Sequence, residues 1–316
     1  MAGVIGRVAP WRQTAWDWRA AGNLIGGGSG TGLLVVAAIA AGPTYPVQAL
    51  LGMGLVGAGL LCVWAEIGRP WRAFNVFRHA RTSWMTREAL LAPLLFAAGL
   101  SAVVSGSRWL AWVTAAFALA YLYCQARMLH AGRGIPAWRH GYVIALMMIT
   151  GMTEGAGWCV LLQATLDARA MPPWHSRSMP EWLSWLLVVL LIARTGVFAG
   201  YRTALARSGA PRNTLAVLER VKLPLTLFDL AAAMAVVAGT VLLTEAELLG
   251  RLGVDMRSWI GPLSSIPAAA GLLAVLSGWW LKFTIVVRAA FNQGFALPRM
   301  PDRGSGSIGP AVKPGW

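Results

Sequence analysis

Polar side chains that can hold protons or donate hydrogen bonds lie at the ends of three apolar segments of this sequence. Asn23 lies near the start of the first segment, and Glu66 and Arg69 end the second. The end of the fourth carries Tyr121, Tyr123, Gln125 and Arg127. A carboxylate can pass protons, a hydroxyl or an amide can bind a carbonyl oxygen, and a guanidinium can stabilise negative charge. We expect these groups to form one cluster at one depth of a membrane.

Glycines follow Asn23 along the first apolar segment. They are Gly26, Gly27, Gly28, Gly30 and Gly32. Close approach of neighbouring helices accounts for such a stripe, and so does a slot in which a flat ring lies against the backbone. The two interpretations are compatible. A quinone needs this combination, because it requires an apolar channel for its tail, donors at its carbonyls and a group that passes protons.

A second set of charged residues lies in the later apolar segments, where charge is costly and marks function by default. Glu154 and Arg194 fall at similar depths near mid-membrane, and Asp229 and Lys282 share the half that bears the first cluster. We expect Glu154 to pair with Arg194, and Asp229 with Lys282. Ion pairs that hold a helix bundle together are one interpretation, and a path for protons or ions is the other.

The composition places these residues in a membrane protein. Hydrophobic residues make up 57% of the 316 residues and charged residues 12%, far from the average of a soluble chain. Apolar stretches long enough to cross roughly 30 Å of hydrocarbon cover residues 20–42, 46–66, 86–106, 108–129, 140–166, 182–204, 223–244 and 263–288. The sequence therefore predicts an all-α polytopic membrane protein with eight transmembrane helices and no removable signal peptide.

Lysine and arginine residues are distributed unequally between the two sets of connections. The two terminal segments and the loops 66–88, 127–139 and 202–222 carry 21 of them, against five on the other side. Under the positive-inside rule both termini are cytoplasmic, and without loop 66–88 the tally is still 16 against five. The net charge of +15 thus reflects topology and not nucleic-acid binding. The basic face suits anionic lipid and an acidic soluble subunit equally.

Ligands for redox metals are sparse. The three cysteines stand in separate apolar segments, and the four histidines lie at helix ends or in loops. Iron–sulfur clusters need sets of cysteines and membrane haems need facing histidines, so we expect neither cofactor and no metal site in this chain. A redox role would then require a partner that carries the metal centres.

Four stretches of the chain combine glycines, aromatic residues and arginines in a specific order. They are EIGRP at 66–70, RTSWMTRE at 81–88, WDWRAAGNLIGGGSGTG at 16–32 and VVRAAFNQGFALP at 286–298. These stretches resemble the NrfD-like family of membrane anchors, which includes the anchor subunits of polysulfide reductase and dimethyl-sulfoxide reductase. The resemblance implies two four-helix bundles, residues 20–130 and 131–290, between a cytoplasmic N-terminal segment (1–19) and a cytoplasmic tail (291–316). It also implies a bacterial or archaeal cytoplasmic membrane.

The resemblance further implies a function that the chain does not perform alone. Such anchors bind a quinone, ubiquinone or menaquinone, and join a four-cluster iron–sulfur subunit that serves a molybdenum or tungsten pterin subunit. By similarity, the quinone site contains Asn23, Gly27, Glu66, Arg69, Tyr123 and Arg127, with Tyr121 replacing Tyr123 if the fourth helix is rotated by two residues. Glu66 is the expected proton-transfer residue, although some relatives have a histidine at this position.

The same likeness makes loop 66–88 the expected docking surface for the partner subunits. The residues expected to contact the partner are Arg72, Arg78, Arg81, Trp84 and Arg87. Because the charge distribution places this loop inside, we expect both partners in the cytoplasm, as in complexes that oxidise sulfite or phenylacetyl-CoA. Electrons would then run from substrate to quinone.

A different class of protein also fits part of the sequence. Glycine-rich stretches at 26–32 and 151–157, together with charges near mid-membrane, suit a secondary transporter built from two repeats or a proton pump. These stretches run in the same direction, and helix packing alone also explains them. A structural anchor without a quinone site is a further alternative.

Overall fold

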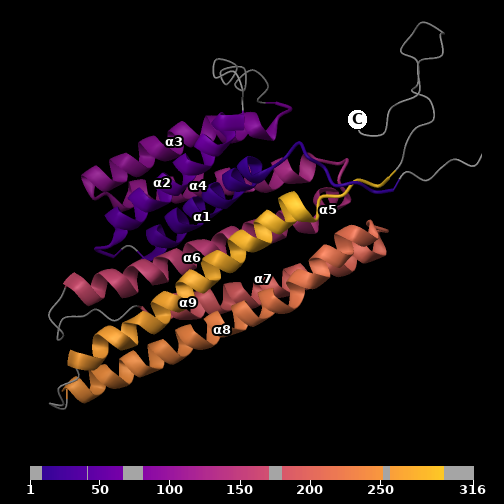
Figure 1. Cartoon of the computed structure of the whole chain (residues 1–316). Helices are drawn as coiled ribbons and strands as arrows, with labels where there is room; N and C mark the ends of the chain where they lie inside the picture. The colour runs from indigo at the N-terminus through magenta and orange to yellow at the C-terminus, as the bar shows by residue number, and fades with distance from the viewer. Residues whose placement is uncertain (1–8, 41, 67–80, 171–179, 252–256, 295–316) are drawn as a thin grey trace, which may run out of the picture.

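The computed structural model describes residues 9–40, 42–66, 81–170, 180–251 and 257–294. These residues are almost entirely helical, and eight of their helices are long and apolar enough to cross a membrane, as predicted (Figure 1). The long helices are α1 (Trp18–Ala40), α2 (Tyr45–Glu66), α3 (Trp84–Ser105), α4 (Arg108–Ala131), α6 (Tyr142–Ala170), α7 (Glu181–Arg207), α8 (Arg212–Arg251) and α9 (Arg257–Phe283). The short helix α5 (Pro136–Arg139) follows α4, and a π-helical turn, η2 (Thr284–Arg288), continues α9.

The seventh span differs from the expectation, because α8 begins at Arg212 and not at residue 223. Its first turns bury Leu218 and Val221, and Glu219 forms ion pairs with Arg202 and Lys222. An amphipathic, ion-paired stretch of this kind is stable as helix. The prediction of a polar loop at 202–222 is therefore wrong, because these residues form two helix ends and a short turn at residues 208–211.

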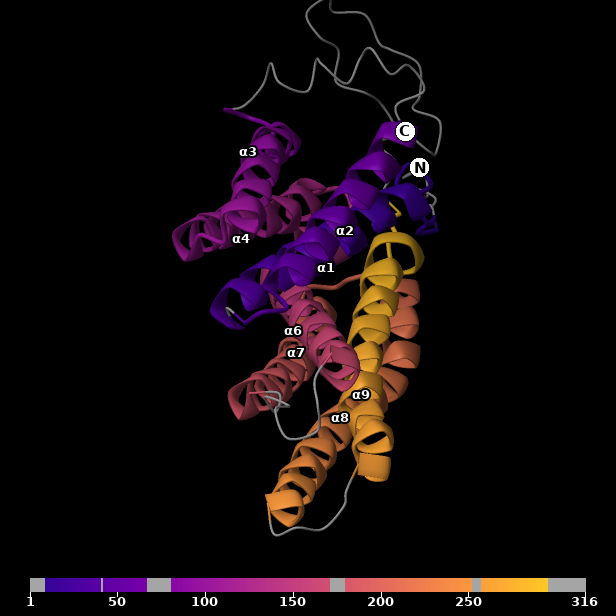
Figure 2. The same ribbon diagram turned by 90° about the vertical axis from the view of Figure 1, so that its left-hand side faces the viewer.

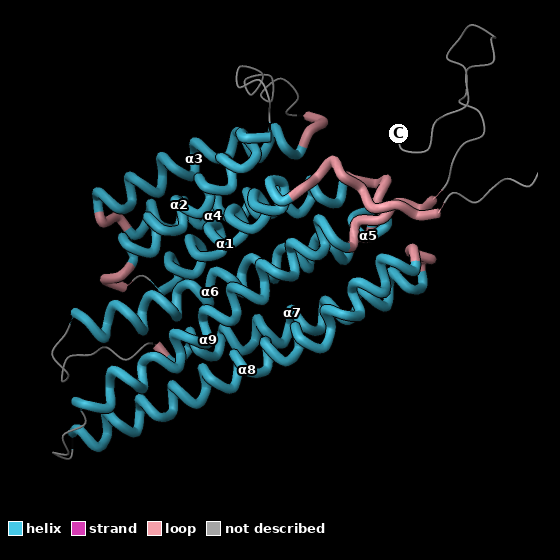
Figure 3. The backbone as a smooth tube through the Cα atoms, in the orientation of Figure 1, coloured by secondary structure: helices cyan, strands magenta, loops and turns pink. Residues whose placement is uncertain are grey.

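The N-terminal segment and the segment after η2 meet at one end of the molecule. Arg12 and Phe291 form an isolated antiparallel bridge, flanked by hydrogen bonds from Gln13 N to Ala290 O (2.9 Å) and from Asn292 N to Trp11 O (3.1 Å). Figure 3 shows these non-helical segments side by side, next to the connection that contains α5. The described parts of the predicted basic connections thus gather at one end of the helices.

Helix α1 lies at the centre of the packing, against α2, α4, α6 and α9. Its glycines permit this, because a Cβ at Gly30 would lie 2.3 Å from the Gly52 carbonyl oxygen of α2. A Cβ at Gly32 would lie 2.0 Å from the Gly151 oxygen of α6. In Figure 2, α1–α4 and α6–α9 occupy opposite halves of the view. Because α1 also packs on α6, the division into two four-helix bundles stays a prediction.

Candidate functional site

A carboxyl group is buried among α1, α3 and α4. Ser83 caps α3 by accepting a hydrogen bond from Thr86 N (3.3 Å). Glu88 of this helix faces inward and is 3% exposed. Asn23 Nδ2 and Gln125 Nε2 donate to Glu88 Oε1 over 3.2 and 3.0 Å. Gln125 Nε2 also donates to the Asn23 carbonyl oxygen (3.0 Å). We call Asn23, Glu88, Tyr121 and Gln125 the carboxyl cluster.

The carboxyl cluster contains polar atoms without a hydrogen-bond partner among the described residues. They are Asn23 Oδ1, Gln125 Oε1 and the Tyr121 hydroxyl oxygen. Tyr121 is fully buried and lies beside Glu88 without meeting hydrogen-bond geometry. Buried polar atoms normally have partners, so this site has unused capacity to bind a polar ligand or water.

Aromatic rings and arginines cover the outer surface of α3 and α4 near the carboxyl cluster. The guanidinium carbons of Arg87 and Arg127 lie 4.1 and 4.6 Å from the centre of the Trp84 ring. Arg127 Nη1 donates to the Tyr123 hydroxyl (3.1 Å), and the Tyr123 ring meets Trp84 edge-on at 5.8 Å. Tyr123 is 39% exposed. These four residues form the aromatic–arginine cluster.

The residues expected in the quinone site are therefore divided. Asn23 belongs to the carboxyl cluster, whereas Tyr123 and Arg127 lie on the outer surface. Tyr121 takes the inward position that the rotated alternative describes. The space over Gly27 is filled, because a Cβ there would lie 2.2 Å from Gln125 Nε2. Glu66 ends α2, but its side chain and the whole of Arg69 lie outside the described residues.

The expected docking residues are described in part. Trp84 and Arg87 lie in the aromatic–arginine cluster, and Arg87 Nη2 donates to the carbonyl oxygen of exposed Arg81 (2.8 Å). Arg72 and Arg78 fall outside the described residues. The described part of the docking loop thus leads directly into α3, the helix that carries Glu88.

The charged residues of the later helices form ion pairs, but the expected partners are wrong. Lys282 Nζ lies 2.6 Å from Glu154 Oε2, and Arg194 pairs with Asp229. Residue depth alone suggested the other combination. Helix α9 packs on both α6 and α8, and its rotation turns Lys282 toward α6, which leaves Asp229 of α8 to face α7.

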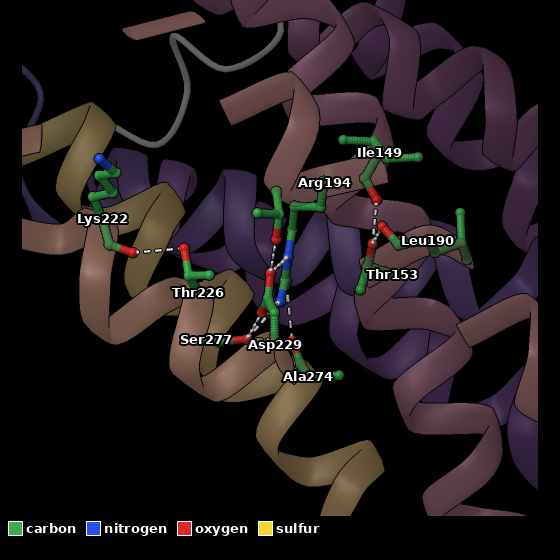
Figure 4. Close-up of polar contacts among 10 residues, drawn as sticks. Ile149, Thr153, Leu190, Arg194, Lys222, Thr226, Asp229, Ala274 and Ser277 are labelled. Carbon is green, nitrogen blue, oxygen red and sulfur yellow. Dashed lines mark hydrogen bonds and ion pairs between the residues drawn. The ribbon is translucent and has the colours of Figure 1, made fainter. Parts of the chain in front are cut away.

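Arg194 is held by several acceptors, as Figure 4 shows. Besides Asp229, its guanidinium donates to Ser277 Oγ (2.7 Å) and to the Ala274 carbonyl oxygen (3.1 Å). Thr195 Oγ1 donates to Asp229 Oδ2 (3.0 Å). A buried charge is tolerated only when it is paired and hydrogen-bonded, and both members of this pair meet that condition.

The Glu154–Lys282 pair connects α6 and α9 to α1. Ser29 Oγ donates to Glu154 Oε2 (2.6 Å) and accepts from Trp279 Nε1 (2.7 Å). The other oxygen, Glu154 Oε1, has no hydrogen-bond partner in the described part of the chain. A Cβ at Gly278 would lie 2.5 Å from Glu154 Oε1 and 3.0 Å from Arg194 Nη1, so the two ion pairs are neighbours. We call Ser29, Glu154, Arg194, Asp229 and Lys282 the ion-pair network.

Sequence reasoning missed Glu88 as a site residue, because it belonged to the basic loop and to the start of an apolar stretch. The signal was an acidic residue two positions inside the predicted window 86–106, after a possible cap at Ser83. Gln125 was recognised at the correct depth but was given no role. No three His, Cys, Asp or Glu side chains come close enough to hold a metal ion in the described ranges.

Fold and sites together define a multi-pass helical membrane protein with buried polar clusters. Models of known protein families give no match to this chain. The chain is similar to a sulfite dehydrogenase subunit of Allochromatium vinosum, with 26% identity over 132 residues. This match covers 35% of the chain and 40% of that relative, so the chain matches about two fifths of the relative's length.

Proposed function

We propose that this chain is the quinone-reactive membrane subunit of an oxidoreductase complex. An iron–sulfur subunit would deliver electrons from a molybdenum or tungsten pterin subunit. The observation that carries the proposal is Glu88, a buried carboxyl held by Asn23 and Gln125. It follows Arg87 of the aromatic–arginine cluster in the sequence. The similarity to a subunit of a sulfite dehydrogenase supports membership of such a complex.

The carboxyl cluster fits the needs of a quinone headgroup. A quinone accepts two electrons and two protons when it is reduced. Tyr121 has an unused hydroxyl that would bind one carbonyl oxygen, and Asn23 would orient the ring through its side-chain amide. Glu88 would hold a proton and release it toward the substrate. It takes the role that sequence similarity assigned to Glu66, which remains a candidate for proton entry from the surface.

The aromatic–arginine cluster suits the approach of both substrate and partner. Arg87 and Arg127 stack on Trp84, so their positive charge is fixed in place and would stabilise negative charge that develops nearby. Arg81 extends the basic surface toward the loop. We place the partner subunits on the cytoplasmic side, because the connections at this end carry most of the lysines and arginines.

The substitution Glu88→Gln tests the proposal in the purified complex. It keeps the side chain's size and removes the carboxyl group that can release and take up a proton. We therefore expect reduction of a soluble quinone analogue to fall by about 100-fold. Transfer to a dye that takes electrons directly from the partner should not change. Glu219→Gln, which removes an exposed carboxylate, is the matched control. Unchanged quinone reduction in Glu88→Gln would contradict the proposed role.

Proton translocation is a second candidate function, and the ion-pair network favours it. The network links charged side chains on α6, α7, α8 and α9 through adjacent positions around Gly278. Charged residues inside a membrane often form proton relays. Complexes reconstituted into vesicles with an internal pH dye would acidify or alkalinise the lumen during turnover if this function is present. Glu154→Gln should then abolish the pH change and leave quinone reduction active.

A further inference from the structure

A cavity of about 390 Å³ opens at the basic end of the molecule, where α4 and α7 end and α5 lies between them. It is separate from the carboxyl cluster and from the ion-pair network. Its polar lining consists of His130, Arg133, Arg139, His140 and Ser208. Every ionisable side chain that the structure describes in this lining is basic, so the lining favours negative charge in the cavity.

The positive charge of the cavity is not neutralised by its own lining. Arg139 Nη1 donates to the Gln293 side-chain oxygen (3.1 Å), which uses one of the five donors of a guanidinium. Positive charge on His130 is disfavoured by the neighbouring Arg127, which lies outside the lining, and by Arg133 and His140 within it. The ends of α4 and α7 contribute only about half a negative charge each, less than two guanidinium groups supply. An anion bound here would remove this repulsion.

The cavity wall is fixed in position before any ligand binds. Trp138 Nε1 donates to the Ile285 carbonyl oxygen of η2 (3.0 Å), and the Tyr201 hydroxyl donates to the Ala137 oxygen (2.7 Å). The Trp16 ring packs on Trp138 with centroids 5.0 Å apart. Helix α5 is thereby tied to α7, η2 and the N-terminal segment, and a preformed site loses little entropy when it binds.

We infer that this cavity binds a phosphate group, with an anionic phospholipid headgroup as its natural source. Guanidinium groups bind phosphate oxygens through paired, charge-assisted hydrogen bonds. The cavity lies where spanning helices leave the hydrocarbon, which is headgroup depth. Tyr142, at the start of α6, stacks on His140 with ring centroids 5.6 Å apart and is 44% exposed, as is usual for tyrosines at a membrane surface. Free phosphate shares this chemistry and is the other source.

The test compares two double variants of the full chain, purified in mild detergent with any partner subunits that remain attached. Arg133→Gln with Arg139→Gln removes two cavity charges. Arg212→Gln with Arg220→Gln removes two exposed charges at the same end, outside the cavity lining. Native mass spectrometry measures retention of phosphatidylglycerol, cardiolipin and phosphatidylcholine. In a parallel arm, inorganic phosphate is titrated at constant ionic strength and thermal unfolding is recorded.

We expect the wild-type chain and the control to retain the anionic lipids in preference to phosphatidylcholine. The cavity variant should bind them about 100-fold more weakly, at roughly tenfold for each charged hydrogen-bonding group. If phosphate stabilises the wild-type chain but not the cavity variant, and lipid retention is equal, the site holds and its ligand is soluble phosphate. Equal behaviour of both double variants in both arms would overturn the inference. So would loss of a partner subunit from the cavity variant with its lipid retained.

Discussion

Lys282 of α9 occupies the space that a side chain at Gly28 of α1 would fill. A Cβ built at position 28 would lie 2.2 Å from Lys282 Nζ. This position brings the ammonium within 2.6 Å of Glu154 Oε2. Gly28 thus does more than allow helices to pack closely. Its missing side chain leaves room for the ion pair between Lys282 of α9 and Glu154 of α6.

The substitution Gly28→Ala should displace the Lys282 ammonium and weaken its contact with Glu154. The clashing atom is the end of a flexible side chain, so the loss should stay below the about 3–5 kcal/mol that removal of one partner of a buried ion pair costs. We expect a measurable fall in the midpoint of thermal unfolding in detergent. Gly54→Ala is the control, because a Cβ at Gly54 has no atom of the described residues within 4 Å. A midpoint for Gly28→Ala equal to that of the control would show that Lys282 can relocate at no cost.

Removal of both charges of the Glu154–Lys282 pair should be tolerated better than removal of one. Lys282→Met leaves a buried carboxylate without its cation, which costs about 3–5 kcal/mol. Lys282→Met combined with Glu154→Gln leaves no unpaired charge and should regain most of that stability. Unfolding midpoints of the two single variants and the double variant form the cycle. Strictly additive losses would mean that the two charges do not interact.

Tyr121→Phe should lower quinone reduction more than Tyr123→Phe does, if the proposed quinone site is correct. Tyr121 is fully buried beside Glu88, whereas Tyr123 is 39% exposed and bonded to Arg127. Loss of one hydrogen bond to substrate costs about 1 kcal/mol, which corresponds to several-fold in kcat/KM. The measurement is quinone reduction by the whole complex at varied quinone concentration. The reverse order of effects would move the site to the outer surface of α4.

Cysteine labelling tests the orientation in the membrane. Ser208 and Ser105 are both exposed, and they lie at opposite ends of the spanning helices. If the basic end is cytoplasmic, a membrane-impermeant maleimide added to intact cells should label Ser105→Cys and spare Ser208→Cys. The native Cys124 and Cys159 are buried and Cys62 is partly buried, so the unsubstituted chain measures the background. Labelling of Ser208→Cys alone would show that the chain has the opposite orientation in the membrane.

Hydropathy predicted the helices well because a span must be apolar over its whole length. Its weak point was the start of α8. Residues such as Arg212 and Lys222 look like a loop when charge alone is counted, but Leu218 packs into the core and Glu219 pairs with neighbouring cations. Amphipathic extensions of a span into water are invisible to a hydropathy window, since their stability comes from one buried face.

The sequence predicted how far along its helix each polar residue lies, but not which way its side chain points. Sequence position sets how far along a helix a residue lies, and this placed Asn23, Tyr121 and Gln125 at one level. Rotation about each helix axis decides which side chains meet, and it depends on packing that no single segment encodes. That is why Tyr121 and not Tyr123 faces Glu88. The exchange of ion-pair partners has the same origin.

The bridge between Arg12 and Phe291 has a topological consequence. It places the beginning of the first span next to the end of the last, so a direct covalent link between these two segments would need little rearrangement. A circularly permuted gene that joins these segments and opens the chain at the exposed Gly106 turn should keep every interhelical contact. The order in which the helices are synthesised would change, while their final arrangement would not.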